Sequence, residues 1–357
     1  VRELAPDLDL REQLAVEGDQ MRAAVDPAVI GTWAVMAGTL PGRGIEVLVR
    51  LVTLSCLGAL IWWRQGGPVA PFLVLLALQG LVALALRPRV LRVTEAVDSA
   101  SRDLDVFVEV ARLLERRRDT SSLLQALRGR LATDSGAASS SIARLSQLVT
   151  MLASRSNVLF APIAGLLMWT TQLAFSIERW RALHGAQVPQ WLDAVAEFDA
   201  LCALAGYAAE HPAHVFPVVT PPPSRLEATD LAHPLLGDSA VANTVRLGGT
   251  APSLLIVSGS NMSGKSTFLR AIGLNVVLAQ MGAPVRAASF SLSPMSVGAS
   301  IRVLDSLQEG HSRFYAEILR LKHIVDLARA NGGATMFLLD EVLSGTNSHD
   351  RRQGAEG

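Results

Sequence analysis

The stretch of sequence that decides the fold of the C-terminal part of this chain reads Gly259-Ser260-Asn261-Met262-Ser263-Gly264-Lys265-Ser266-Thr267. It fits the pattern Gly-x-x-x-x-Gly-Lys-Ser/Thr, in which glycines let backbone N–H groups close around phosphates. The apolar run 254–257 before it predicts a buried strand, and the run 268–278 after it predicts a helix whose positive N-terminal end faces those phosphates. Lys265 would bind the β- and γ-phosphates, and the Ser266 hydroxyl would ligate Mg²⁺. The stretch is therefore predicted to be a P-loop that binds ATP with Mg²⁺.

An acidic pair, Asp340-Glu341, follows the apolar run 335–339, which predicts a second strand. At the end of that strand Asp340 would hold the magnesium shell, and Glu341 would be the catalytic base that polarises a water molecule. Because a hydrolytic water is unwanted in a small-molecule kinase, the tandem carboxylate favours ATP hydrolysis. The predicted catalytic residues include Glu341 and Lys265, and the predicted metal ligands are Ser266 and Asp340.

A third feature, the segment 310–317, opens a helix that we expect to run to about residue 330. Ser312 is well placed to cap the N-terminus of that helix. A helix end tipped with serine could equally approach the γ-phosphate of a nucleotide bound to another subunit, and the residues alone leave both roles open. The alternation of short strands and helices after residue 225 predicts an α/β domain with a largely parallel sheet.

The bulk composition excludes several classes of protein. Lys and Arg number 32, as do Asp and Glu, so no overall positive field attracts nucleic acid. Only two cysteines occur, Cys56 and Cys202, which excludes a disulfide framework and a cysteine-rich metal site and fits a reducing compartment. The chain opens at Val1 without an initiator Met or a signal peptide and stops soon after the acidic pair, so we expect it to be a fragment.

Two apolar segments near the N-terminus predict a membrane hairpin over residues 44–92. Segment 68–86 carries no charge and is close to the ~20 residues that a membrane-spanning helix needs. A Gly-Gly turn joins it to segment 45–63, which is apolar apart from Glu46 and Arg50 and is short for a span unless Arg50 snorkels. The Trp62-Trp63 pair and the flanking arginines, including Arg87, Arg89 and Arg92, fit membrane interfaces with both termini in the cytoplasm. The alternative is a helical hairpin buried in a soluble core. A third apolar run, 157–176, is either a core helix or a further span.

The remaining sequence divides by pattern. Residues 1–43 predict short amphipathic helices, 93–210 an all-α domain, and the Pro-rich stretch 211–224 a stiff connector to a C-terminal domain over 225–357. The basic run 116–118 is interpreted as a solvated helix face, with nucleic-acid binding as the alternative.

Together these motifs resemble the ATPase domain of the MutS family of DNA mismatch-repair proteins. The resemblance rests on Asn261-Met262 within the loop, the segments 279–285 and 297–300, the pattern Ser312-x-Phe314-x-x-Glu317, and Ser344-Gly345-Thr346-Asn347 after the acidic pair. Upstream, residues 233–236 and Ala242-Asn243 resemble the segment that leads into the nucleotide site, and the helical region 93–210 is loosely similar to the family's core and lever domains. The implied fold is a P-loop NTPase domain of the MutS/ABC type after a helical core and lever region.

The resemblance implies a homodimer in which each ATP lies between the P-loop of one subunit and Ser312 of the other, acting in trans. It further implies that ATP turnover drives clamp motion on double-stranded DNA. No segment resembles the family's N-terminal mismatch-reading domain, and a small residue near Ala240 or Val241 stands where an aromatic side chain would stack on adenine. Mismatch recognition is therefore not implied.

The leading hypothesis is a dimeric MutS-like ATPase anchored in the cytoplasmic membrane, with its ATPase domain in the cytoplasm. One alternative is the ATPase subunit of a transporter-like machine, although residues 310–314 do not form the Leu-Ser-Gly-Gly-Gln type of signature expected of it. Another is a nucleotide-gated membrane scaffold without a DNA role, for which Glu341 would be dispensable.

Overall fold

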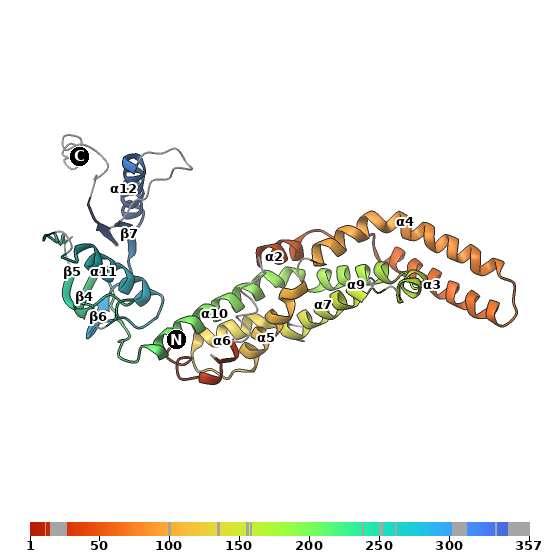
Figure 1. Cartoon of the computed structure of the whole chain (residues 1–357), viewed down its shortest axis with the longest axis horizontal. Helices are drawn as coiled ribbons and strands as arrows, with labels where there is room; N and C mark the ends of the chain where they lie inside the picture. Colours follow the sequence, from red (N-terminus) through yellow and green to blue (C-terminus); the bar gives the residue numbers. More distant parts are fainter. Residues whose placement is uncertain are drawn as a thin grey trace. The chain divides into compact units, whose positions relative to one another are not determined.

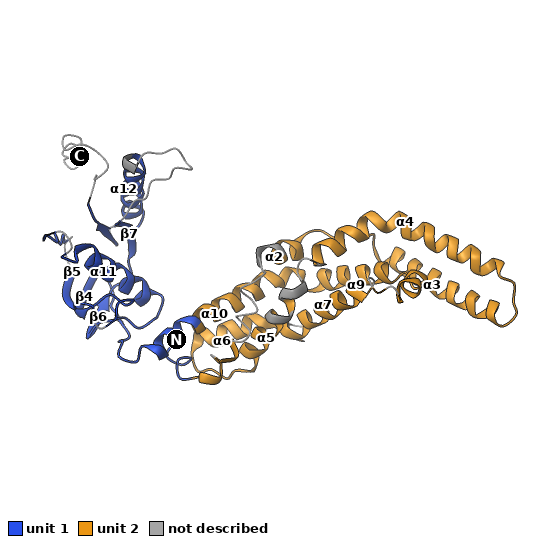
Figure 2. Ribbon diagram, viewed as in Figure 1, with its two compact units in different colours: residues 1–6, 203–357 blue, residues 7–202 orange. Residues whose placement is uncertain are grey.

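The chain forms two compact units in the computed structural model (Figures 1 and 2). The helical unit comprises residues 7–202, and the C-terminal unit comprises residues 1–6 and 203–357. The structure describes residues 1–10, 12–14, 27–98, 101–133, 136–154, 157, 159–237, 239–249, 253–260, 263–301, 313–332 and 334–341.

The helical unit is built from helices connected by short segments. They are α2 (Pro27–Val35), α3 (Arg43–Arg64), α4 (Ala70–Asp98), α5 (Ser101–Arg116), α6 (Ser122–Leu131), α7 (Ala138–Ala153), α8 (Ala161–Leu166), α9 (Trp169–His184), the 3₁₀ turn η2 (Gly185–Gln187) and α10 (Val188–Glu210). A two-stranded antiparallel ribbon, β1 (Ala132–Thr133) with β2 (Gly136–Ala137), links α6 to α7. Fully buried leucine and aromatic side chains form the core, among them Leu114, Leu127, Leu145, Ile177, Trp191 and Phe198.

Within the basic run 116–118, Arg116 and Arg118 are exposed, whereas Arg117 lies inside this unit. The Arg117 guanidinium lies 2.5 Å from an Asp7 carboxylate oxygen and 2.8 Å from one of Asp119. Arg117 is mostly buried, and α5 has already ended at Arg116. The interpretation as a solvated helix face is therefore wrong for Arg117, which is engaged in an internal ion pair.

Helices α3 and α4 form an antiparallel hairpin that extends beyond the ends of α7 and α9 (Figure 1). Both helices are long and apolar enough to cross a membrane, a test that the core helix of a soluble protein also passes. However, only 28% and 11% of their most apolar windows are buried, which does not fit a hairpin hidden in a soluble core. Helix α4 continues through Pro88 to Asp98, so Arg87, Arg89 and Arg92 lie within the helix and not after it. Membrane crossing stays a prediction.

The third apolar run, 157–176, is divided between two helices. It contains α8 and the first half of α9, separated at Met168, whose φ of 47° interrupts the helical path. Leu173, Ala174 and Phe175 are buried inside the helical unit. The second half of the run is therefore a core helix, whereas α8 has no buried residue.

The C-terminal unit contains a mixed sheet and a separate parallel strand pair. The four-stranded sheet has the order β3-β6-β4-β5, with β3 (Val218–Val219), β4 (Arg225–Leu231), β5 (Asn243–Gly248) and β6 (Ser289–Leu292). Strand β4 is antiparallel to both neighbours, with Leu226 opposite Leu292 and Ala228 opposite Phe290, while β3 is parallel to β6. Strands β7 (Ser296–Ser300) and β8 (Thr335–Leu339) pair in parallel. The helices are α11 (Lys265–Gln280) and α12 (Arg313–Ala330).

The prediction of a largely parallel sheet is wrong for the described part of this unit. A parallel crossover needs a dozen or more residues, usually with a helix, and the short helix-free segment between β4 and β5 returns the chain antiparallel instead. The predicted helices and the strand over 335–339 do form, as α11, α12 and β8.

The buried strand predicted over residues 254–257 is also not formed. Residues 253–260 have no regular secondary structure, and Leu254, Leu255 and Ile256 are 71%, 44% and 78% exposed. A strand exists through hydrogen bonds to a neighbour, and no β-ladder among the described residues includes this segment. The apolar run 254–257 was therefore not sufficient to predict a strand.

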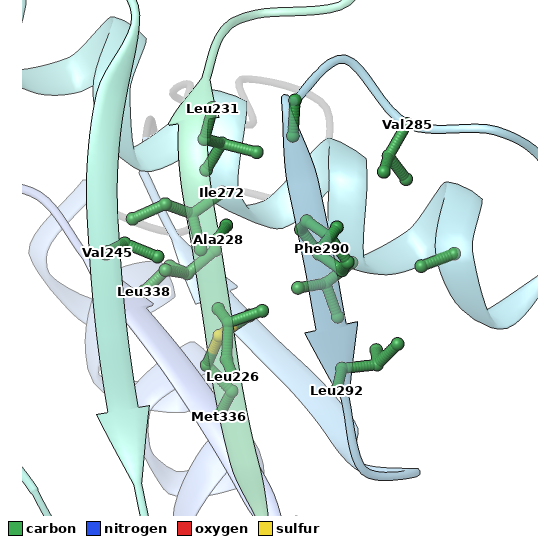
Figure 3. Packing of buried hydrophobic residues seen from close by; sticks show 13 residues of the cluster. Leu226, Ala228, Leu231, Val245, Ile272, Val285, Phe290, Leu292, Met336 and Leu338 are labelled. Carbon is green, nitrogen blue, oxygen red and sulfur yellow. The ribbon is translucent and has the colours of Figure 1, made fainter. Parts of the chain in front are cut away.

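One hydrophobic core joins the sheet, α11 and the β7–β8 pair (Figure 3). Its members include Leu226, Leu231, Val245, Ile272, Val276, Phe290, Met336 and Leu338. Helix α11 approaches β8 so closely that a Cβ at Gly273 would lie 2.7 Å from the Leu338 side chain. The core therefore packs the helix that follows the P-loop sequence against the strand that precedes the acidic pair.

The boundary between the two units lies inside α10, between Cys202 and Ala203, and not in the connector 211–224. The last turns of α10 belong to the C-terminal unit and contact the connector. The Tyr207 hydroxyl is hydrogen-bonded to His214 Nδ1 at 3.0 Å, and the His211 and His214 rings stack with their centres 4.7 Å apart. The connector itself contributes β3 to the sheet and contains a cis peptide bond at Pro222-Pro223.

Candidate nucleotide site

The loop 259–264 leads directly into the N-terminus of α11. Gly264 is the N-cap residue and has a φ of 89°, a left-handed conformation that residues with a Cβ rarely adopt. At Gly259 a Cβ would lie 2.8 Å from Ser263 Oγ, so the Ser263 side chain would have to move. Asn261 and Met262 lie outside the described residues. The backbone geometry of the loop thus requires a glycine at Gly264.

Lys265 is the first residue of α11 and folds back over this loop. Its Nζ donates to the carbonyl oxygens of Gly259 and Ser260 at 2.9 and 2.7 Å. The Ser263 N–H closes the loop by donating to Ser260 O at 3.3 Å. The ammonium therefore lies beside the carbonyl oxygens at the start of the loop.

The choice of lysine at this position is informative. The 32 Lys and Arg residues of the chain include just two lysines, Lys265 and Lys322. An ammonium is a compact point charge, whereas a guanidinium is a wide planar fork. One of the two ammonium groups of this arginine-rich chain therefore lies directly after the Gly-rich loop, at the start of α11. Ser266, partly buried, and Thr267, exposed, follow in the first turn of α11.

The acidic pair lies at the end of β8. The Asp340 N–H donates to Ser300 O at 2.9 Å, which extends the β7–β8 ladder by one residue and leaves the Asp340 side chain partly buried. Glu341 is exposed and has a φ of 49°, so the chain turns sharply after the strand. The structure therefore places the two carboxylates in different environments.

The donor set suits Mg²⁺. Ser266 offers a hydroxyl oxygen and Asp340 a carboxylate oxygen, the hard ligands that Mg²⁺ prefers, and this ion usually takes only one or two carboxylates together with phosphates and water. Among the described residues no group of three His, Cys, Asp or Glu side chains could hold a metal by itself. A site shared with a nucleotide's phosphates is consistent with such a small set of protein ligands.

Ser312 lies outside the described residues, so its role stays a prediction. The helix that it was expected to open, α12, is present from Arg313. Glu317 of this helix is 4% exposed, and Ile324 packs against Gly298 of β7. The helix that follows Ser312 is thus anchored on the β7–β8 pair.

Two positioning residues were missed by the sequence analysis. Asn275 of α11 is fully buried: its Nδ2 donates to Ala232 O at 3.0 Å and Ala271 O at 2.7 Å, and its Oδ1 accepts the Arg286 N–H at 2.8 Å. The Arg286 guanidinium donates to the carbonyl oxygens of His233, Leu236 and Gly237. These two side chains fix the segment 232–237. A single Asn in the middle of an otherwise apolar helix was the available signal.

The fixed segment carries His233, where burial, and then the positive charges of Arg270 and Arg286, lower the pKa. His233 is therefore neutral at pH 7, and its Nδ1 accepts the Leu235 N–H at 3.3 Å. Further along, Leu235 and Val241 are 76% and 79% exposed. The stretch around residue 240 thus presents small or aliphatic side chains, in agreement with the absence of an aromatic residue there.

Comparison with known protein families gives a match in this region. Residues 255–354 match MutS domain V. The predicted resemblance to the MutS family is confirmed, and the matched range includes Lys265, Ser266, Asp340 and Glu341.

Relatives of the chain carry the same family name. It is 35% identical over 193 residues to the DNA mismatch repair protein MSH6 of Arabidopsis thaliana, covering 50% of this chain and 14% of that protein. It is 38% identical over 172 residues to the DNA mismatch repair protein MutS of Synechococcus sp. (strain JA-2-3B'a(2-13)), covering 46% and 18%. With the MSH3 protein of Vanderwaltozyma polyspora the identity is 32% over 160 residues, covering 44% and 15%. The chain thus spans less than a fifth of the length of these relatives.

Proposed function

We propose that this chain binds ATP with Mg²⁺ through its MutS domain V and hydrolyses it. The observation that carries the proposal is the loop 259–264, whose left-handed Gly264 leads into α11 and whose Gly259 and Ser260 carbonyl oxygens accept from the Lys265 ammonium. The family match over residues 255–354 supports the same reading. ATP and Mg²⁺ are the cofactors of this activity.

Each residue has a chemical task in the proposed reaction. The loop amides and the first turn of α11 donate to the phosphates, while Lys265 gives up its carbonyl partners and pairs with the β- and γ-phosphates. Ser266 and Asp340 hold Mg²⁺, which, when bound, neutralises charge that develops on the phosphates. Glu341 accepts a proton from the attacking water. Ser312 of the partner subunit completes the site by donating to the γ-phosphate.

We further propose that the active form is a homodimer through the MutS domains V, and that turnover drives motion on double-stranded DNA. This part is supported by the names of the relatives, which are DNA mismatch repair proteins. Those names do not favour the alternative of a transporter-like ATPase. The balanced net charge places the DNA contact on a local surface and not on the whole chain.

A separate observation supports membrane anchoring by the α3–α4 hairpin. Large apolar side chains are exposed on both helices, including Leu48, Leu54, Ile61, Leu73, Val74, Leu81 and Leu84. Exposed apolar patches of this extent mark an interaction with lipid or with another protein. In the proposal the hairpin anchors the chain in the cytoplasmic membrane and the MutS domain V works in the cytoplasm.

The test is ATP binding and turnover by the full chain in lipid nanodiscs, without DNA and with paired, mismatched or branched duplexes. Lys265→Ala should weaken ATP binding by roughly 100-fold, the loss of two charge-assisted hydrogen bonds. The matched control is Lys322→Ala, which removes the other lysine, exposed on α12, and should leave binding unchanged. Unaltered ATP affinity in Lys265→Ala would overturn the assignment of the loop.

The DNA arms of the experiment address the second part of the proposal. Acceleration of ATP turnover by any duplex supports coupling to DNA. Turnover that is the same with and without every DNA contradicts this coupling and favours a nucleotide-gated membrane scaffold.

A further inference from the structure

Helix α8 presents apolar residues to its surroundings. No residue of α8 is buried, and Leu159 and Ile163 are 88% and 51% exposed. Ala161, Pro162 and Gly165 are exposed as well, and the run 157–176 contains no charged residue. A short solvated segment of a soluble protein normally carries polar side chains. Segment 159–168 is therefore unusual, and the hydrophobic effect requires that something cover it.

The same segment is attached to the α3–α4 hairpin through a buried amide. Gln79 of α4 is 2% exposed, and its Nε2 donates to Leu166 O, the last residue of α8, at 2.7 Å. The same nitrogen lies 3.5 Å from Thr53 Oγ1 of α3. Gln172 Nε2 donates to Leu167 O at 2.7 Å. Two side-chain amides thus satisfy the carbonyl groups that the break between α8 and α9 leaves free.

This arrangement is the one that an apolar environment demands. Where water cannot reach, every backbone carbonyl freed by a helix break must find a donor within the protein, and polar side chains of neighbouring helices supply it. In water the Leu166 and Leu167 carbonyls would need no such partners. Buried glutamine side chains are also rare, and Gln79 Oε1 has no hydrogen-bond donor within reach among the described residues.

Gln79 also fixes the level of α8 along the hairpin. At 1.5 Å per residue, Gln79 lies about 14 Å from the start of α4 at the hairpin tip, and Thr53 about 17 Å from the end of α3. Half the thickness of a bilayer's hydrocarbon core is about 15 Å. When the hairpin tip is inserted, α8 therefore lies no further than about one leaflet from it.

The borders of the apolar surface favour lipid over protein as the covering partner. Trp62 and Trp63 stand at the hairpin tip, with Trp63 stacked on Phe72 at 5.9 Å, and exposed Arg87, Arg89 and Arg92 stand at its base. Aromatic and basic residues at the two ends of an apolar zone are the pattern of membrane interfaces. A protein interface is a one-sided patch with a polar rim, whereas here both helices and α8 are apolar over exposed faces.

We propose that residues 159–168 are a third lipid contact, embedded near the middle of the bilayer beside the hairpin and fixed to it by Gln79. The inference rests on the proposed membrane anchoring. It adds that the anchor is a three-part module, α3, α4 and α8, so the bilayer contacts the polypeptide immediately before α9, a helix that packs in the core of the helical unit.

The test measures depth in the bilayer at single cysteines. In the full chain Cys56 and Cys202, both buried and free, are replaced by Ala, and one cysteine is introduced at Ile163, Val74 or Leu183. Val74 is an exposed residue of the hairpin, and Leu183 is the matched control, an apolar residue of α9 that is 69% exposed. Each is labelled with a small environment-sensitive fluorophore in vesicles of equal parts phosphatidylethanolamine and phosphatidylglycerol. Spin-labelled lipids then quench fluorophores that lie within the hydrocarbon.

The expected result is quenching at Ile163→Cys and Val74→Cys at least about threefold greater than at Leu183→Cys, because only embedded sites meet acyl chains. In the Gln79→Leu background the residue 163 label should lose its defined depth while the residue 74 label keeps its own. Quenching at 74 without quenching at 163 would overturn the three-part module and leave the hairpin anchor intact.

Two further outcomes overturn the inference in other ways. Absence of quenching at both 163 and 74 would remove the membrane anchor together with the module. Protection of residue 163 from a water-soluble thiol reagent that increases with protein concentration in the absence of lipid would show that a second copy of the chain covers α8.

Discussion

At the scale of single residues, Asn275 connects three separate pieces of backbone in the C-terminal unit. It joins its own helix α11 to the end of β4 at Ala232 and to Arg286 before β6. Arg286 then holds the carbonyl groups of the segment that resembles the approach to the nucleotide site. The Asn275 amide uses both of its N–H donors and one lone pair of its oxygen in these hydrogen bonds. An apolar side chain at this position would leave the Ala232 carbonyl and the Arg286 N–H without these partners.

Asn275→Ala is therefore expected to lower the free energy of unfolding of the C-terminal unit by about 2–3 kcal/mol. The measurement is amide hydrogen exchange in α11, β4 and β6, which reports local opening of this unit. Asn331→Ala is the matched control, since Asn331 also bonds the carbonyl four residues before it, Leu327 O, but is exposed; it should cost less than about 1 kcal/mol. Equal exchange in both variants would show that Asn275 does not stabilise the fold.

The residues of the P-loop sequence were predictable because its chemistry is local. Gly264 must adopt a positive φ at the helix start, Lys265 follows it, and an apolar helix comes next, all of which can be read from neighbouring positions. Asn275 and Arg286 act through partners 43 and about 50 residues away, respectively, in the chain. Contacts at such separations depend on how β4, α11 and β6 pack, which no local pattern specifies.

At the scale of elements, the hairpin α3–α4 has two parts with different packing. The half near its base is packed on the helical unit, with Leu86, Val90 and Val93 of α4 buried. In contrast, none of the described side chains of α4 from 70 to 78 is buried. Removal of the whole segment 44–92 would thus damage the core of the helical unit, and a test of anchoring must change only the exposed half.

Leu73→Glu combined with Leu78→Glu is the change that tests the hairpin as an anchor. Both side chains are exposed, so the fold should be retained, while a carboxylate in the apolar part of a membrane helix is costly, up to about 2.5–3.5 kcal/mol at the helix centre. We expect the variant to leave the membrane fraction in a vesicle flotation assay. Leu183→Glu, an exposed leucine of α9, should float like the unaltered chain. An unaltered chain that remains soluble without lipid or detergent would contradict the anchor.

The sequence predicts an element well when the spacing of its apolar residues is enough to define it. It predicts an element poorly when the element depends on pairing with another strand. Helices α11 and α12 and strand β8 formed as expected, because their apolar residues recur with the period of the element. The run 254–257 has the same apolar character as β8 but no ladder partner among the described residues, so it is not a strand. The direction of β4 and β5 followed from the length of their connection, which could have been used to predict the antiparallel pair.

At the scale of the whole molecule, α10 is one continuous helix whose residues belong to both units. Its end carries Tyr207 and His211, which contact His214 in the connector, and Arg2 lies 4.5 Å from the ring centre of Phe216. Burial, and then the charges of His211 and Arg286, lower the pKa of His214, so this contact is made by a neutral imidazole at pH 7. Helix α10 thus continues without a break from the helical unit into the C-terminal unit.

The proposed dimer supplies the last prediction, which concerns Glu341→Gln. Glutamine keeps the size of the side chain and the capacity to bind ATP, but it cannot accept a proton from water. A general base contributes roughly 10²–10⁴-fold to a rate, so turnover should fall by at least about 100-fold. ATP that persists between two subunits holds them together, and the variant should therefore be dimeric in ATP and Mg²⁺ by analytical sedimentation in nanodiscs or detergent.

Two controls separate the role of the carboxylate from a general effect of lost charge. Glu210→Gln removes an exposed carboxylate at the end of α10 and should leave turnover and assembly unchanged. Adding Lys265→Ala to Glu341→Gln should abolish the ATP-dependent dimer, because the loop no longer holds the nucleotide that joins the subunits. Turnover at the unaltered rate in Glu341→Gln would rule out this residue as the base. A variant that hydrolyses ATP slowly but stays monomeric with ATP would support Glu341 as the general base and contradict a nucleotide site shared between two subunits. A nucleotide bound by one subunit alone would not hold a second subunit in place.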